Sequence, residues 1–392
     1  MTSNSRVLLS TGLLLAVLSA LTLRASASDE SPRIITFDAP DAGTLAAPCL
    51  LQGTFPYLVN NKGEIAGNFQ DANNVLHGLL RAPDGVVTAF DAPGAGSGAC
   101  QGTQGFTINS EGTIAGKTID AGNVQHGMLR TRDGAVTTFD VQGMSTVSGL
   151  GALATSINRE GTITGFYFDV STVAHSFLRA EDGAITSVDI PGEGTGAFQG
   201  NSLCAVDCIN RKGATVGLYF DANNVGHGFV RAPDGAITTF DVPGAGTGAF
   251  QGTSPGGINP EGVIAGVYTD ANNVNHGFVL APDGTFSTFD VPGAGTGTFQ
   301  GTLPSGFLGI NAKGTITGAY VDANNVNHGF VRAPDGAITT FDVPGSGTGA
   351  FQGTSPIGIN AEGAITGYYI DASNVGHGFL RTAHHCENCE DE

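Results

Sequence analysis

The chain has 392 residues, only 13% of which are charged, and its formal net charge is −19. A surface this acidic repels other polyanions, so the charge argues against nucleic acid and anionic lipid as partners. Glycine is the commonest residue, with 61 copies, but it recurs at fixed positions between apolar runs. That regularity indicates turns in an ordered β protein and argues against a disordered chain.

Residues 1–27 have the pattern of an export signal. Arg6 precedes an apolar run from Val7 to Leu23, and Ala25-Ser26-Ala27 fits a cleavage site for signal peptidase. The alternative is a retained membrane anchor, but the run is near the lower limit of about 17 residues for a span. We therefore predict a protein exported to the periplasm or the extracellular space, with no membrane span in the mature chain.

Residues 28–382 are predicted to be one domain built from seven copies of a unit of about 49 residues. Each copy is centred on the pattern Asp-Ala-Asn-Asn-Val-x-His-Gly-Phe or a close variant of it. A unit of this size cannot bury its own apolar faces, so the copies must pack against one another. The repeated histidines are His77, His126, His175, His227, His276, His328 and His377.

The copy from Gly309 to Pro344 predicts four short strands. Gly309–Asn311 ends the first strand, Thr315–Val321 alternates with the period of two that is typical of a strand, and His328–Arg332 and Ala337–Val343 follow. Asn and Asp residues form the turns between them, and Pro344 ends the fourth strand. The mature sequence shows no helical periodicity over three turns, so the fold class is all-β.

Four strands per copy, joined by tight turns, are typical of a propeller blade. The last copy lacks its fourth strand, and the missing segment occurs near the other end of the chain, at Ile34–Asp38. We therefore predict a seven-bladed β-propeller of four-stranded antiparallel blades, in which the N-terminal strand pairs into the last blade. An open β-solenoid is the alternative, but it leaves the complementary ends unexplained.

The order of these elements resembles the HAF family of extracellular bacterial repeats. The resemblance covers about residues 33–382 and depends on Ile-Asn-x-x-Gly at Ile258–Gly262, a strand with Ile-x-Gly, and His-Gly-Phe at His276–Phe278. The chain departs from the family in having Gly or Ser where the family has Ala, and Arg where many copies have Trp. The resemblance implies export and a β-rich repeat fold, and it carries over no catalytic residues.

Six cysteines in an exported chain predict disulfide bonds. Cys49 and Cys100 occupy nearly the same place in the first two copies, so we predict a bridge between them. Cys204 and Cys208 lie in a three-residue insertion and are predicted to close a local loop.

An acidic tail, residues 383–392, follows the last copy. It contains four residues of the types that bind zinc, although a local disulfide or a loose tail fits an oxidising compartment better. These weak metal candidates are His384, His385, Cys386 and Cys389.

The candidate binding residues are the polar side chains of the Asp-Ala-Asn-Asn links. Together with an aromatic ring such as Phe250, which lies in an adjoining link with Gln251, carboxylate and amide groups suit the hydroxyls and the apolar side of a sugar. The alternative is that these side chains only cap turns while Phe250 packs between blades; a calcium site is weaker still. The set is Asp71, Asn73, Asn74, Asp221, Asn223, Asn224, Asp270, Asn272, Asn273, Asp322, Asn324 and Asn325.

The repeated histidines are predicted to be structural, since a catalytic group needs one special environment. We expect His328 to bond to a loop backbone and Arg332 to pair with Asp342. The sequence thus predicts a secreted, monomeric, non-enzymatic module without cofactor that binds glycan or protein at several equivalent places. The alternatives are a lyase or hydrolase with its site at the central channel, and a purely structural envelope protein.

Overall fold

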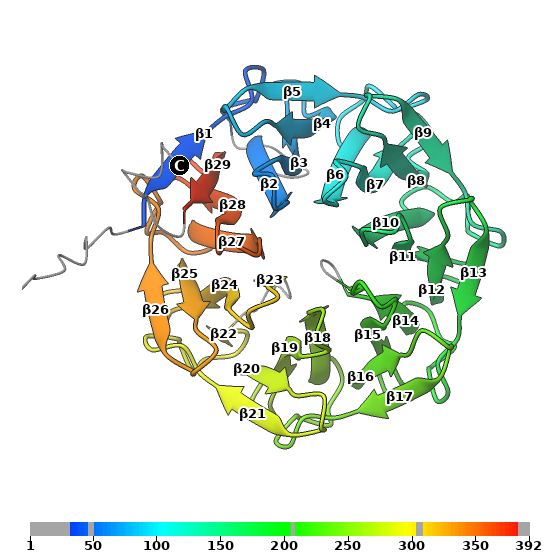
Figure 1. The fold of residues 1–392 in the computed structure, drawn as a ribbon, viewed down its shortest axis with the longest axis vertical. Coiled ribbons are helices and arrows are strands. Elements are labelled where there is room, and N and C mark those ends of the chain that lie inside the picture. The colour runs from blue at the N-terminus through cyan, green and yellow to red at the C-terminus, as the bar shows by residue number, and fades with distance from the viewer. Residues whose placement is uncertain (1–31, 46–50, 205–207, 303–308, 383–392) are drawn as a thin grey trace, which may run out of the picture.

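The computed structural model describes residues 32–45, 51–204, 208–302 and 309–382. The described residues form strands and turns and contain no helix, which confirms the all-β fold class. Figure 1 shows the strands arranged around a common centre, in groups that follow one another along the chain. No helix of the described residues has the length and apolar character needed to span a bilayer.

The strands fall into groups of four that pair as antiparallel meanders, as β14, β15, β16 and β17 do. The first strands are β2 (Gly53–Val59), β6 (Gly102–Ile108), β10 (Ala152–Ile157), β14 (Gly200–Leu203), β18 (Gly252–Ile258), β22 (Gly301–Thr302) with β23 (Gly309–Ile310), and β27 (Gly353–Ile359). In Figure 1, first strands such as β2, β6, β10, β18, β23 and β27 lie nearest the centre. The second strands are β3 (Ile65–Gln70), β7 (Ile114–Ile119), β11 (Ile163–Phe168), β15 (Thr215–Phe220), β19 (Ile264–Thr269), β24 (Ile316–Val321) and β28 (Ile365–Ile370).

The third strands carry the repeated histidines, and the fourth strands are outermost in Figure 1. The third strands are β4 (Leu76–Arg81), β8 (Gln125–Arg130), β12 (Ala174–Arg179), β16 (Gly226–Arg231), β20 (Asn275–Leu280), β25 (Asn327–Arg332) and β29 (Gly376–Arg381). The fourth strands are β5 (Val87–Phe90), β9 (Val136–Phe139), β13 (Ile185–Val188), β17 (Ile237–Phe240), β21 (Phe286–Phe289) and β26 (Ile338–Phe341). Below, the groups are numbered by their first strands, from group 1 (β2) to group 7 (β27).

Group 7 takes its fourth strand from the start of the chain. β1 (Ile34–Phe37) pairs antiparallel with β29, with Ile34 opposite Arg381 and Phe37 opposite Gly378. Figure 1 shows β1 in blue beside β29 in red. Gly53 of β2 also pairs with Gly376 of β29, so group 1 contacts group 7 directly.

Phenylalanines of the third and fourth strands fill the space between groups. Phe229 and Phe330 are fully buried, and the ring of Phe240 covers Gly228 on the neighbouring strand. A Cβ atom at Gly228 would lie only 2.6 Å from that ring, so glycine is required there. Burial of a phenylalanine is worth about 1.5–3 kcal/mol, which makes this repeated layer a main source of stability.

Asparagines near the centre link six of the seven groups to the next one. Oδ1 of each asparagine caps its own turn, and in these six Nδ2 donates to the backbone oxygen of the matching asparagine one group further on. The last of these bonds, from Asn360 to the oxygen of Asn60, spans 300 residues at 3.2 Å. The other pairs are Asn60–Asn109, Asn109–Asn158, Asn210–Asn259, Asn259–Asn311 and Asn311–Asn360.

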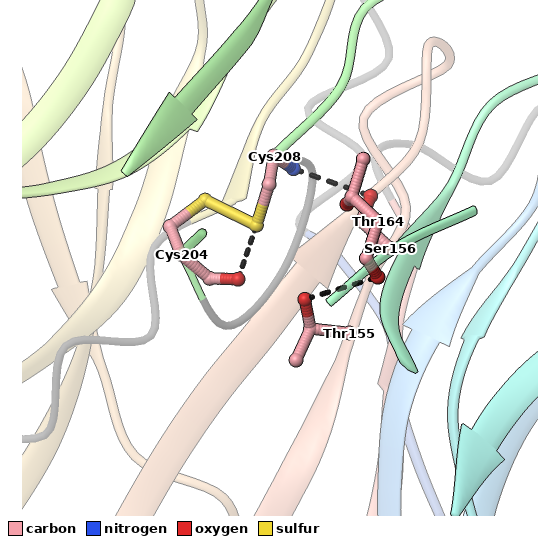
Figure 2. The surroundings of a disulfide bond; sticks show 5 residues. All are labelled: Thr155, Ser156, Thr164, Cys204 and Cys208. Carbon is pink, nitrogen blue, oxygen red and sulfur yellow. Dashed lines mark hydrogen bonds between the residues drawn. A yellow bond between two sulfur atoms is a disulfide. The ribbon is translucent and has the colours of Figure 1, made fainter. Parts of the chain in front are cut away.

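The insertion in group 4 is closed by a disulfide bond between Cys204 and Cys208, as the sequence predicts. Both cysteines are buried, and the N–H of Cys208 donates to the hydroxyl of Ser156 at 3.2 Å. Figure 2 shows the bridge beside Thr155, Ser156 and Thr164 of the preceding group. The hydrogen bond from Cys208 to Ser156 therefore joins the disulfide to group 3.

Candidate functional site

The Asp-Ala-Asn-Asn turns and the links between groups lie on one side of the molecule, which we call the loop face. The N–H of Phe250, in the link between groups 4 and 5, donates to the oxygen of Asn224 in group 4 at 2.7 Å. Nε2 of the next residue, Gln251, donates to Oδ1 of Asn273 in group 5 at 3.0 Å. Each link therefore contacts the turns on both sides of it.

The aspartate of each turn is held by the turn itself. Oδ1 of Asp221 accepts the N–H groups of Asn223 and Val225 at 2.8 and 2.9 Å, and Oδ2 accepts the side-chain amide of Asn223. Partial burial would raise the pKa of Asp221, but these hydrogen bonds outweigh it and the pKa is lowered. Asp71, Asp270 and Asp322 make the same bonds. The carboxylate thus primarily shapes the turn.

The last asparagine of each turn fixes the link between groups. Asn224 has a positive φ of 61°, a conformation that asparagine tolerates better than most residues. Its Oδ1 accepts the side-chain amide of Gln199 at 3.0 Å, and Asn74, Asn273 and Asn325 accept Gln52, Gln251 and Gln300 in the same way. These asparagines therefore position the loop face.

The middle asparagines are the members of the predicted set that remain exposed. Asn73, Asn223, Asn272 and Asn324 all face solvent. Each donates through Nδ2 to the aspartate two residues earlier. The sequence-predicted residues are thus brought to one face, and the third residue of each of these turns exposes a side-chain amide there.

The links present exposed phenylalanine rings. Phe198, Phe250, Phe299 and Phe351 have exposures of 66%, 71%, 64% and 77%, so the alternative in which Phe250 packs between blades is wrong. All four have φ values between 61° and 66°. The rings of Phe198 and Phe250 contact Phe168 and Phe220 edge to face at 6.0 and 6.3 Å. The predicted set of site residues omits these phenylalanines, although the recurrence of Phe-Gln-Gly in the links marks their position.

The repeated histidines bond to carboxylates, which corrects the prediction that they bond to loop backbone. Nδ1 of His328 lies 2.9 Å from Asp342, and Nε2 lies 3.8 Å from Asp322. The imidazole also stacks on Tyr320, with ring centroids 5.0 Å apart. The same carboxylate contacts occur at His77, His126, His175, His227, His276 and His377.

Arg332 does not pair with Asp342, because the register of β25 and β26 places Arg332 opposite Ile338 and Asp342 at the other end of β25, beside His328. The guanidinium lies over the ring of Phe289 in the preceding group. The same contact occurs in five groups, with 4.9–5.2 Å between the guanidinium carbon and the centroid of the ring. Partial desolvation lowers the pKa of Arg332. In this arrangement the arginine joins neighbouring groups through a cation–π contact.

One side-chain cluster in the described part of the chain has ligand atoms suited to a metal ion. It consists of His175, Asp189 and Glu193, whose ligand atoms lie within 4.8 Å of one another. Glu193 replaces the alanine of other links and is bonded to the amide of Asn201. Burial raises the pKa of Glu193, which favours its protonated form and works against metal binding.

Two cysteine predictions involve residues outside the described ranges. Cys100 is disulfide-bonded, but Cys49, its predicted partner, lies outside the described residues. His384, His385, Cys386 and Cys389 also lie outside them. Both proposals remain predictions.

No family model matches the chain, and no curated protein matches it. Solved structures of β-propeller proteins do resemble it. The lectin BP39L from Burkholderia pseudomallei has a TM-score of 0.54 and 8% identity, over 83% of this chain and 94% of the lectin. A prolyl endopeptidase structure has a TM-score of 0.55 and 11% identity, over 80% of this chain and 45% of the endopeptidase.

TolB from Acinetobacter baumannii is also similar, with a TM-score of 0.44 and 10% identity, over 82% of this chain. The chain spans 64% of the length of TolB and less than half of the endopeptidase. At these identities the likeness to the lectin and the endopeptidase shows a propeller-like fold and nothing about activity.

Proposed function

We propose that the chain is an exported, monomeric seven-bladed β-propeller, closed by β1 in the last blade, that binds glycans at repeated sites on its loop face. The β1–β29 pairing and the bond from Asn360 to Asn60 support closure. Each of the seven groups then corresponds to one blade. The role in binding rests on the loop face and not on the lectin neighbour, whose similarity concerns the fold.

The four exposed phenylalanines carry the proposal. A ring with 64–77% of its surface exposed gains little from burial, and a positive φ costs a residue with a Cβ atom about 1–2 kcal/mol relative to the usual helical region. Gly149, with a φ of 86°, occupies the same position in the link between groups 2 and 3. The fold therefore accepts glycine at this position, and the exposed rings are available for contact with a ligand.

The chemistry beside each ring fits a sugar. The exposed amide of Asn223 lies one residue before Asn224, whose backbone oxygen holds Phe250. An aromatic face packs against the apolar side of a pyranose, while amide groups pair with its hydroxyls. Asn272 and Asn324 have the same place beside Phe299 and Phe351, whereas Ser171 has it beside Phe198. With three places on one face that combine a ring and an amide, weak single contacts add up to avidity.

An enzyme at the central channel has less support. The cavity at the channel end opposite the loop face has a volume of about 440 Å³ and is lined by the repeated asparagines and their neighbours. Those asparagine side chains cap turns and link groups, as described above. Their repetition favours a structural role at that end.

A glycan array probed with the mature protein tests the proposal. A variant with glycine at Phe198, Phe250, Phe299 and Phe351 should bind at least about tenfold more weakly, because the apolar contact is lost at every site at once. The matched variant Gly149→Phe adds a fifth ring and should bind more strongly. Equal binding by the parent and the four-glycine variant, or capture of proteins but no glycan, would overturn the proposal.

A further inference from the structure

A cavity of about 220 Å³ lies between groups 7 and 1. Its walls come from β2 and β3 of group 1 and from β27 and β28 of group 7, and Gln104 of β6 in group 2 also contributes. Phe351, one of the exposed rings of the loop face, forms part of its lining. The cavity is smaller than the clefts of roughly 300–1,000 Å³ that hold drug-sized ligands.

The polar part of the lining is uncharged. Among the described residues that line the cavity, the hydrogen-bonding groups include the amides of Asn68, Gln70 and Gln104 and the hydroxyls of Tyr57 and Tyr368. The three amide side chains are 2%, 0% and 6% exposed. A charged ligand would lose its hydration there without gaining a counter-charge, so the lining selects a neutral one.

One of these amides has an unused acceptor. Nε2 of Gln70 donates to the oxygen of Asn74 at 3.0 Å, whereas Oε1 is buried and has no hydrogen-bond partner among the described residues. Nε2 of Gln104 contacts Oδ1 of Asn68 at 3.5 Å, which is long for a hydrogen bond. A buried, unpaired acceptor costs about 1–3 kcal/mol, so a donor from a ligand would relieve it.

Aromatic rings form the rest of the wall. Phe55 meets Tyr368 edge to face at 5.2 Å, and Tyr57 meets Phe106 at 5.4 Å. Burial, with a contribution from Tyr368, raises the pKa of the Tyr57 hydroxyl well above its ordinary value. Tyr57 therefore stays protonated at all physiological pH values and adds no charge to the cavity.

Residues that line the cavity occupy positions at which the copies of the repeat differ. The second strand of every group carries glycine at one position, as at Gly67, and the residue after it is different in each group. That residue is Tyr368, Asn68 and Lys117 in groups 7, 1 and 2, and Phe166, Leu218, Val267 and Ala319 in groups 3 to 6. Polar side chains are thus confined to three groups in succession, and these include the two that form most of the cavity.

We propose that this cavity is a single binding pocket for a neutral, polyhydroxylated ring such as one hexose unit, distinct from the repeated sites of the loop face. Hydroxyl donors of the ring pair with Gln70 and the neighbouring amides, and its apolar side lies against Phe55 or Phe351. The inference does not depend on glycan binding by the loop face, because different residues form the two sites apart from Phe351.

Titration calorimetry and saturation-transfer NMR with free sugars test the pocket. The probes are neutral hexoses, an N-acetylhexosamine, a hexuronate and a cationic amino sugar. We expect one saturable site per chain for at least one neutral sugar, and at least about tenfold weaker binding of the hexuronate and the amino sugar. The variants Asn68→Leu and Gln70→Ile should each weaken the neutral sugar by about tenfold, the effect of losing a well-placed hydrogen bond.

Each variant introduces the residue type that another group carries at the same position: Leu218 is equivalent to Asn68, and Ile119 to Gln70. The matched control Leu218→Val repeats the residue of group 5 at a position far from the cavity and should leave affinity unchanged. Unaltered binding by both pocket variants, preference for a charged sugar, or no binding of any neutral sugar by the folded protein would overturn the inference. Because Phe198, Phe250 and Phe299 lie outside the cavity, glycine at these three leaves the pocket intact and separates it from the loop face.

Discussion

His377 bonds to Asp38, which lies 339 residues earlier in the chain. Nδ1 of the histidine is 3.0 Å from the nearer carboxylate oxygen, within about 0.1 Å of the His328–Asp342 contact inside group 6. The contact between the two ends of the chain therefore repeats the geometry of a contact within one copy. A group completed by two distant segments has the same internal bonding as one made from a continuous segment.

This equivalence is testable by double-mutant cycles. Asp38→Asn with His377→Gln should give a coupling energy below about 1 kcal/mol, because one partner is half exposed. Asp342→Asn with His328→Gln should give the same value within error. Free energies of unfolding from urea titration provide both numbers. Coupling inside group 6 without coupling between the ends would contradict closure.

Group 3 has different residues at two facing positions, and this difference leads to a prediction about stability. In most groups a glycine on the third strand faces a phenylalanine on the fourth, as Gly228 faces Phe240, whereas Ser176 faces Val188 in group 3. Val188→Phe alone should destabilise the fold by about 1–3 kcal/mol, since the ring would overlap the Cβ of Ser176. Adding Ser176→Gly should recover most of that loss.

The control for this pair is Ser176→Gly alone, which removes a buried hydroxyl without a hydrogen-bond partner. Thermal unfolding of the three variants measures the effect. If the double variant is no more stable than Val188→Phe, the two residues are not compensating partners, and the difference in group 3 has another origin.

The sequence was sufficient to predict the strands, the turns and the partner of β1. Period-two alternation and the split repeat depend on local geometry and on the need to bury both faces of each sheet. It could not predict the partners of His328 and Arg332. Alternation places both on one face of a strand, but the ring under Arg332 comes from the preceding group, and nothing in the local pattern identifies Phe289.

The sequence pattern does not predict the cavity between groups 7 and 1, for a related reason. Its residues have the pattern of ordinary strand residues, and the repeated turn motifs do not include them. The signal for the cavity is not a repeated position but a strand position that differs in every copy and is polar in only three of them. Asn68 and Tyr368 become neighbours only when the two ends of the chain meet, so that signal needs the fold to be known.

Lys117 predicts a pH dependence of stability. Burial lowers its pKa to about 8, from an ordinary value of 10.5, and its Nζ donates to Gln125 at 3.1 Å. Between pH 8 and 10.5 the unfolded chain therefore binds this proton more strongly than the folded chain does, so Lys117 makes stability rise with pH across that window. Below pH 8 both states hold the proton and the destabilising effect is complete.

Urea unfolding at pH 7.5 and pH 9.5 checks this sign. Lys117→Leu, which copies Leu218 of group 4, should be more stable than the parent at pH 7.5, and its advantage should shrink by pH 9.5. Tyrosines of the unfolded chain begin to titrate near the top of this range, but they are common to both proteins, so they cancel in the comparison. An advantage that is independent of pH would mean that the Lys117 pKa is not lowered.

Phe250→Gly separates stability from binding on the loop face. Phe250 is 71% exposed with a φ of 63°, so glycine removes backbone strain and leaves little cavity. Against this gain stands the larger entropy of glycine in the unfolded chain, about 0.4–1 kcal/mol. We expect the folded protein to be as stable as the parent or up to about 1 kcal/mol more stable, while glycan avidity falls.

The parallel change Phe229→Gly, at a fully buried ring, should instead cost at least about 3 kcal/mol. Chemical denaturation of both variants, alongside binding of the first, distinguishes the two kinds of phenylalanine: a large loss of stability in Phe250→Gly would mean that the exposed ring is structural and would remove the main argument for a binding face.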